Sequence, residues 1–222
     1  MKLNIDHFVL AADTLEQGIA YLQEQLGITI PFGGVHPAMG THKCPMQLSE
    51  DLFFEIIAIN PLSLTDDTLK VKQPRWFSLD NPYLQAQLKH QPILLTWVAN
   101  TRDMQRSANS GIYRQCAIRN ISRGDLNWQF ALPDDGSLLA NGLIPYVLQW
   151  SGEHPAVKMA DLGCSLIEIN LFHPQKTWIE SQLQEIGAAH LINIESLDNH
   201  QQGYFEVILQ SASGKVTLSS RV

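Results

Sequence analysis

The chain has few cysteines, and they are not spaced as a functional set. Its 222 residues include only Cys44, Cys116 and Cys164, which lie far apart and form no CxxC pair. An odd number of isolated thiols excludes a disulfide framework and predicts reduced cysteines in a reducing compartment. We therefore expect a cytoplasmic protein in which these thiols are small buried apolar residues.

Positive charge and long apolar runs are also scarce. Lysine and arginine number 15 against 22 acidic residues, so the formal net charge is -7. Without a basic field the chain is not expected to bind a nucleic-acid backbone. No apolar run reaches the roughly 20 residues that span a bilayer, and the N-terminus enters a strand pattern directly. We expect neither nucleic acid nor a membrane as a partner.

Three motifs of nucleotide and nucleophile chemistry are missing. The sequence has no GxxxxGK[ST] loop, no GxGxxG after a strand and no Ser-His-Asp order with a nucleophile elbow. Nucleotide-driven, dinucleotide-dependent and serine-hydrolase reactions are therefore set aside. What remains is an ordinary globular composition, 45% hydrophobic and 17% charged, and enough length for one large or two small domains.

Residues 3–11, LNIDHFVLA, predict a strand with one imidazole in its middle. Successive side chains of a strand point to opposite faces, so Phe8 and Leu10 share one face while His7 and Val9 share the other. If Phe8 and Leu10 pack on a helix, His7 faces across the sheet. Such a histidine is either a core group bonded to a neighbour or a ligand within a site.

A strand-helix-strand-strand-strand order follows from the pattern of the first 58 residues. Apolar residues recur at helical spacing over 14–26, and Gly27 ends the helix. We then predict a strand over 28–32, a glycine-bearing loop over 33–42, and a hairpin of 46–48 with 52–58.

The same order recurs twice, which is the strongest architectural signal of the sequence. The second round is predicted at 93–99, 103–108, 115–118, 125–132 and 143–150. The third is predicted at 164–172, 178–186, 191–195, 205–210 and 215–219. We therefore predict an α+β fold built from repeated βαβββ modules.

Several of these stretches resemble the glyoxalase-like domain branch of the vicinal oxygen chelate (glyoxalase/bleomycin resistance/dioxygenase) superfamily. They are IDHFVLA at 5–11, LG at 26–27, GVHPAMGTH at 34–42, FEIIA at 54–58, SRGDLNW at 122–128, NGLIPY at 141–146 and EHPA at 153–156. The resemblance implies a half-open curved sheet whose concave face holds the site. Residues 1–155 would form the paired core, residues 156–222 an additional module packed on it, and two chains could pair as a homodimer.

The resemblance also implies a divalent metal held by first-strand and last-strand residues. His7 takes the first position and Glu55 the second, while Gln149 falls at the corresponding last-strand place of the second module. Imidazole and carboxylate together suit iron, manganese, zinc or nickel, whereas an amide oxygen is a weak ligand. A stronger third ligand would come from His42 or His36 if their loop folds over the face, or from Glu168.

Further residues have both a binding and a structural interpretation. Arg123 either clamps a carboxylate or phosphate group of a ligand or faces water at a hairpin end. Trp97, Trp128 and Trp150 either line an aromatic pocket or fill the sheet interior. His36, which precedes a proline, either contacts the ligand or forms a turn.

Two functions from different classes follow. The first is a metal-dependent enzyme of lyase, isomerase or dioxygenase type, in which Glu55 or Glu168 moves protons on a small oxygen-bearing metabolite. The second is a metal-free protein of the same fold that binds or sequesters a small molecule. The replacement of a second carboxylate by Gln149 favours the second function.

Overall fold

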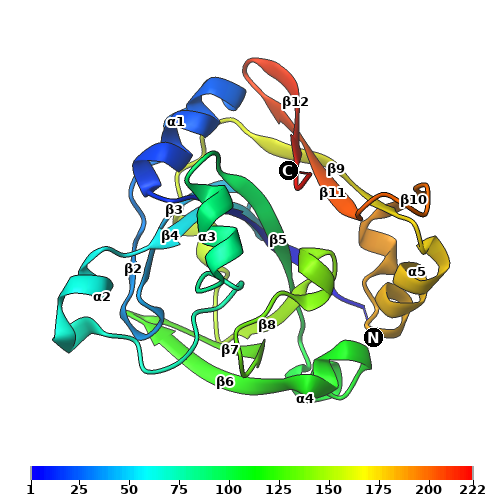
Figure 1. The fold of residues 1–222 in the computed structure, drawn as a ribbon, viewed down its shortest axis with the longest axis horizontal. Coiled ribbons are helices and arrows are strands. Elements are labelled where there is room, and N and C mark those ends of the chain that lie inside the picture. Colours follow the sequence, from blue (N-terminus) through cyan, green and yellow to red (C-terminus); the bar gives the residue numbers. More distant parts are fainter. Residues whose placement is uncertain (1, 222) are drawn as a thin grey trace.

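Two βαβββ units form one strongly curved eight-stranded sheet in the computed structural model, which describes residues 2–221 (Figure 1). The first unit comprises β1 (Asn4–Ala11), α1 (Leu15–Leu26), β2 (Gly34–His36), β3 (Thr41–Ser49) and β4 (Leu52–Ile59). The second comprises β5 (Ile93–Asn100), α4 (Met104–Ala108), β6 (Cys116–Arg123), β7 (Leu126–Pro133) and β8 (Tyr146–Trp150). The predicted α+β fold of repeated βαβββ modules is confirmed.

The first strands of the two units lie at the centre of this sheet. Its order is β2-β3-β4-β1-β5-β8-β7-β6, with β1 parallel to β4, β5 parallel to β8, and β1 antiparallel to β5. The outer strands β2 and β6 curl towards each other, so that Arg123 at the end of β6 lies 3.4 Å from His36 at the end of β2. The sheet is therefore nearly closed around its concave face.

Helix α1 covers the convex face because its sequence caps and packs it there. The Thr14 side chain accepts a hydrogen bond from the backbone N–H of Gln17, and Gly27 ends the helix in the left-handed conformation. Leu22 and Leu26 are fully buried. Gly18 lets the helix approach β4 closely, since a Cβ at that position would lie 2.4 Å from Ile56 Cγ2.

A connector between the two units closes one side of the concave face. It contains the short helices α2 (Leu62–Thr65) and α3 (Pro82–Leu88), the latter capped by the Asn81 side chain. Trp76 and Phe77 of the connector are buried against Phe130 of β7. The predicted short helix near residues 83–89 is confirmed.

The C-terminal residues form a second, four-stranded sheet beside the first (Figure 1). Its order is β10 (Asn193–Ser196), β9 (Ser165–His173), β11 (Tyr204–Ser211) and β12 (Gly214–Ser219), with helix α5 (Lys176–Glu185) between β9 and β10 in sequence. The division into domains at residues 155 and 156 stays a prediction. No helix within residues 2–221 is long and apolar enough to cross a membrane.

The structure differs from the prediction between residues 28 and 45. Residues 28–32 form no strand, and most of the predicted loop over 33–42 is β2, a 3-10 turn and the start of β3. The sequence did not predict the first half of β3 because it contains Pro45, and proline has no N–H to donate to a neighbouring strand. Strand β2 pairs with β3 only up to Lys43, so Pro45 lies where β3 has no neighbour on that side.

Candidate functional site

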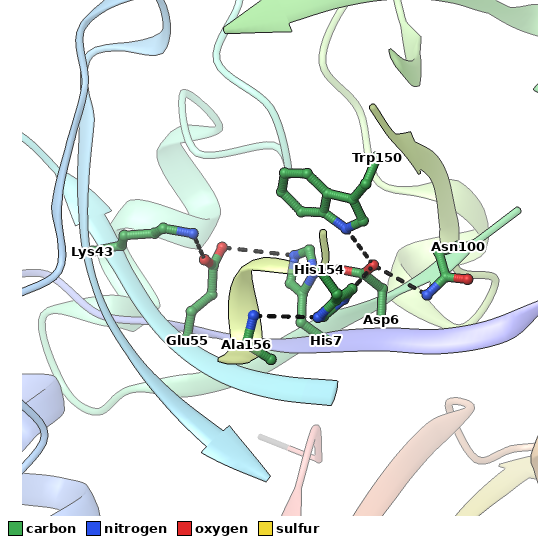
Figure 2. Close-up of polar contacts among 8 residues, drawn as sticks. All are labelled: Asp6, His7, Lys43, Glu55, Asn100, Trp150, His154 and Ala156. Carbon is green, nitrogen blue, oxygen red and sulfur yellow. Dashed lines mark hydrogen bonds and ion pairs between the residues drawn. The ribbon is translucent and has the colours of Figure 1, made fainter. Parts of the chain in front are cut away.

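A β-bulge in β1 brings two neighbouring polar side chains to the same side of the strand. Ile5 pairs with Ala99 of β5 and His7 with Val98, so Asp6 is the extra residue with no partner across the ladder. Such an insertion interrupts the alternation of side chains and re-aims them. Asp6 and His7 therefore lie side by side (Figure 2).

His7 is oriented by Asp6 and directed at Glu55. Its Nδ1 lies 2.6 Å from Asp6 Oδ1, and its Nε2 lies 3.8 Å from Glu55 Oε1. An ionised carboxylate can only accept, so His7 Nδ1 carries the hydrogen of this bond. In the neutral ring Nε2 then keeps its lone pair. The ring also stacks on Phe53, with centroids 4.3 Å apart.

Asp6 is a fully buried carboxylate with an unusually complete set of donors. Its Oδ2 accepts from Trp150 Nε1 at 2.8 Å, His154 Nε2 at 3.1 Å and Asn100 Nδ2 at 3.3 Å (Figure 2). Burial alone would raise the pKa of Asp6, but the hydrogen bonds and charges of His154 and His7 outweigh it and lower that pKa strongly. Asp6 therefore stays ionised and fixes His7.

Glu55 forms a buried ion pair with Lys43. Pro45 is the residue opposite Glu55, so Lys43 lies two positions along β3 on the same face, and its Nζ is 2.5 Å from Glu55 Oε2. Burial would raise the pKa of Glu55, but Lys43 and His7 outweigh it and lower that pKa. Burial lowers the pKa of Lys43, and Glu55 opposes this effect. One carboxylate oxygen of Glu55 therefore faces Lys43 and the other faces His7.

These groups line a small pocket on the concave face, of about 30 Å³. Six aromatic side chains form half of its lining: Phe53, Trp76, Phe77, Trp128, Phe130 and Trp150. Leu148, His36 and Arg123 complete it, with Arg123 Nη1 3.4 Å from His36 Nε2. Burial, followed by the charges of Lys43 and Arg123, lowers the pKa of His36 well below its ordinary value. His36 is therefore a neutral ring.

The structure brings together five of the predicted site residues. His7, His36, Glu55, Arg123 and Trp128 all line the pocket. The role of each in binding or catalysis stays a prediction.

Four other predicted residues lie elsewhere. Gln149 accepts from the backbone N–H of Met104 at 2.8 Å, whereas its neighbours Leu148 and Trp150 line the pocket. His42 belongs to β3 rather than a loop, and alternation places it on the opposite face from Lys43. Glu168 lies in the second sheet, 3.8 Å from Lys215 Nζ.

Trp97 is the fourth of these residues. It pairs with Phe8, is fully buried and donates to the Leu143 carbonyl at 3.1 Å. It lies in the core and not among the residues that line the pocket.

Sequence reasoning missed Asp6, Lys43 and His154. Asp6 was hidden by the bulge, because strict alternation assigns it to the face of Phe8. Lys43 was hidden by the assignment of 33–42 to a loop. The only sequence signal was the position of Lys43, two residues before the proline that begins the mainly apolar stretch PMQL at 45–48.

The donors do not fit the metal that the resemblance implies. Only His7 and Glu55 converge, and Lys43 already pairs with Glu55 Oε2, where a metal would need that carboxylate. Gln149 and His42 point to other surroundings. Within residues 2–221 no three His, Cys, Asp or Glu side chains gather as a metal site. Three or more such donors are the usual requirement for transition metals.

The curved sheet of two βαβββ units is the fold that the glyoxalase-like resemblance implies. The sequence matches the family of the glyoxalase-like domain over residues 5–187, and the chain therefore belongs to this family. The resemblance seen in the sequence is confirmed. Comparison with curated proteins gives no significant match.

Solved structures with a similar fold include two enzymes of Streptomyces coelicolor. A methylmalonyl-CoA epimerase variant is 12% identical, with 69% of this chain and 99% of that chain covered and a TM-score of 0.42. A 4-hydroxymandelate synthase variant is 14% identical, with 98% of this chain and 62% of that chain covered and a TM-score of 0.46.

The methylmalonyl-CoA epimerase of Mycobacterium tuberculosis is 15% identical, with 66% and 86% covered and a TM-score of 0.39. Likeness at this level says nothing about the substrate of the present chain.

Proposed function

We propose that this chain is an acid-base enzyme that moves a proton on a small oxygen-bearing metabolite bound on the concave face. The observation that carries the proposal is the Asp6–His7 pair: Asp6 holds Nδ1, and the His7 ring lines the same pocket as Lys43, with its Nε2 3.8 Å from Glu55 Oε1. A base oriented by a buried carboxylate and set next to a fixed cation suits the abstraction of a proton next to a carbonyl group.

In the proposed reaction, His7 Nε2 takes the proton from the carbon next to the carbonyl. The electron pair of the broken C–H bond moves towards the carbonyl oxygen, where the Lys43 ammonium stabilises the developing charge. Asp6 stabilises the imidazolium that forms, as the acid does in serine-protease triads. Return of the proton from His7 to the same or another carbon completes an isomerisation, and departure of a leaving group completes an elimination.

Glu55 supports this step by holding Lys43 in its charged form. Because Glu55 keeps its own charge, the Lys43 ammonium retains a matched partner before and after the proton moves. The aromatic walls exclude water, which strengthens the interaction between Lys43 and an enolate oxygen.

A small-molecule binding protein of the same fold is the second candidate. The observation that favours it is Gln149, which stands at the expected place of a second carboxylate and bonds the Met104 backbone instead of entering the pocket. We further propose a cytoplasmic homodimer, for which the support is the isolated thiols and the resemblance.

Exchange of carbon-bound protons with solvent tests the enzyme directly. The protein is incubated in D₂O with 2-oxohexanoate or 2-hexanone, and the loss of the proton signal next to the carbonyl is followed by NMR. We expect exchange above the buffer rate, lost by about 100-fold or more in His7→Gln. Lys43→Met should lower it comparably, while His90→Gln, a change of an exposed histidine outside the site, should retain it.

Asp6→Asn separates a positioning role from a structural one. Loss of the Asp6 charge removes what fixes the His7 tautomer, so the rate should fall and its pH profile should shift, with the fold intact by circular dichroism. Exchange that is equal in wild type and His7→Gln for both compounds contradicts the enzyme and leaves the binding protein.

A further inference from the structure

Arg123 stands between the inner pocket and a larger outer groove. It lines both the pocket of about 30 Å³ and a neighbouring groove of about 380 Å³. Apolar residues form most of the groove, among them Pro31, Phe32, Pro45, Leu126 and Met159. A ligand that enters the inner pocket from this side passes the guanidinium.

The guanidinium of Arg123 interacts with the charge of Glu55 at a distance but makes no direct ion pair with a described residue. Within residues 2–221 no carboxylate oxygen lies at ion-pair distance from it, and its hydrogen-bond partner is the neutral His36 ring. A hydrogen bond from a guanidinium to a charged acceptor is stronger than one to a neutral acceptor such as the His36 ring. The planar guanidinium can also form two parallel hydrogen bonds with a carboxylate. The site therefore offers a place for an anion at the mouth of the inner pocket.

The charges around the pocket leave a surplus of one positive charge. Lys43 and Arg123 are positive, and Glu55 is the negative side chain of the inner lining. The outer groove adds one charge of each sign, Asp125 and Lys158, so the surplus over both spaces is still one. Asp6 does not line the pocket. Its carboxylate is hydrogen-bonded by His7, His154, Trp150 and Asn100 and is left out of this balance. A monoanion balances this surplus, whereas a dianion would leave a buried negative charge.

Two further features fit an apolar ligand that carries oxygen. Phe32 in the outer groove is 63% exposed, so a large apolar side chain there has no protein cover. Trp76 lines the inner pocket, and its indole N–H is buried without an acceptor among residues 2–221. Buried donors usually find a partner, which a ligand oxygen would supply.

We propose that the ligand is an apolar monocarboxylate that spans both spaces. Its carboxylate pairs with Arg123, the carbonyl group next to that carboxylate faces the inner pocket and His7, and its apolar chain lies along Phe32 and Leu126. The placement of the reactive end rests on the proposed function, while the binding of the carboxylate and the chain does not.

Binding of four unreactive probes tests the ligand class by calorimetry. We compare hexanoate, hexanamide, acetate and hexyl phosphate with the intact chain. Hexanoate should bind about tenfold or more tightly than hexanamide, which lacks the charge, and than acetate, which lacks the chain. Hexyl phosphate should bind more weakly than hexanoate, because its second charge is unmatched.

Variants of the two contact residues make the test specific. Arg123→Gln should weaken hexanoate about tenfold or more and leave hexanamide within twofold, and Arg123→Lys should give an intermediate loss. Arg114→Gln, a change of an exposed arginine outside the groove, should have no effect. Phe32→Ser should weaken hexanoate but not acetate, whereas the exposed Leu64→Ser should change neither.

The outcomes separate this inference from the proposed function. Equal affinity for hexanoate and hexanamide, tighter binding of hexyl phosphate, an unaffected Arg123→Gln or no binding of any probe overturns the ligand class. Hexanoate binding without proton exchange on 2-oxohexanoate overturns the enzyme alone. Exchange on 2-hexanone at the rate of 2-oxohexanoate keeps the enzyme and overturns the monocarboxylate.

Discussion

Lys43 and Glu55 form an ion pair that is almost sealed from water, with Lys43 5% and Glu55 3% exposed and 2.5 Å between Nζ and Oε2. The pair lies in an aromatic wall, where Lys43 Nζ is also 5.1 Å from the centre of the Phe53 ring. In such surroundings each charge depends on the other, because neither can be solvated.

Removal of one member of this pair should destabilise the fold more than removal of both. Lys43→Met leaves the Glu55 charge buried and should cost about 3–5 kcal/mol of unfolding free energy. The double variant Lys43→Met with Glu55→Leu should recover most of that loss. Urea unfolding measures both, with Lys70→Met of the exposed Lys70–Asp67 pair as a control that costs less than about 1 kcal/mol. Equal losses in the single and double variants would show that the charges are not coupled.

Asp6 should make the protein sensitive to acid. The pKa of Asp6 is lowered in the folded state, so its stabilisation is complete above the unfolded value of about 3.9 and is lost as the pH falls below it. Below that pH, Asp6 is protonated in the unfolded chain but still ionised in the folded chain. Melting temperatures measured from pH 7 down to pH 2 should fall less steeply in Asp6→Asn than in wild type. Asp198→Asn, at an exposed carboxylate, should follow the wild-type curve.

Replacement of the Lys43 cation by an acid should create a metal site. In Lys43→Glu, His7 and Glu55 gain a carboxylate as third donor in place of the competing ammonium. Zn²⁺ or Co²⁺ should then raise the melting temperature of the variant by mass action and leave that of the wild type unchanged. The comparison is made by calorimetry with and without a chelator. An equal rise of the melting temperature in the wild type would show that the wild-type site binds a metal and would contradict this prediction.

Gly18 of α1 should not tolerate alanine despite its place in a helix. Alanine usually favours a helix interior by about 1 kcal/mol over glycine, but here its Cβ would meet Ile56 Cγ2 at 2.4 Å. Overpacking of this kind costs about 1–3 kcal/mol, so Gly18→Ala should lower the unfolding free energy. In an Ile56→Ala background the same change should become neutral or stabilising. A destabilisation that persists there would point to another cause.

Much of the fold was predictable because its signals are local. Hydrophobic alternation placed β1 and β4, helical spacing and Gly27 placed α1, and repetition of the element order indicated the second unit. The predicted bounds of α1, 14–26, differ from Leu15–Leu26 by one residue.

The site was less predictable because it depends on one-residue shifts. The bulge at Asp6 is a property of the pairing with β5 and has no signature in LNIDHFVLA. In β8 the prediction was wrong by one residue: it placed Gln149 on the concave face, whereas Trp150 lies there. Because side chains of a strand alternate between faces, an error of one residue selects the opposite face. The position of Lys43 in the site could be predicted only if β3 was known to continue through Pro45.

The two halves of the curved sheet supply different parts of the pocket. His7, Lys43 and Glu55 come from β1, β3 and β4, whereas Arg123, Trp128 and Trp150 come from β6, β7 and β8. The groups proposed to move the proton thus all come from the first unit, whereas Arg123, the proposed partner of the carboxylate, comes from the second. A library confined to the second unit would vary Arg123 and the tryptophan walls while the groups proposed to react stay unchanged.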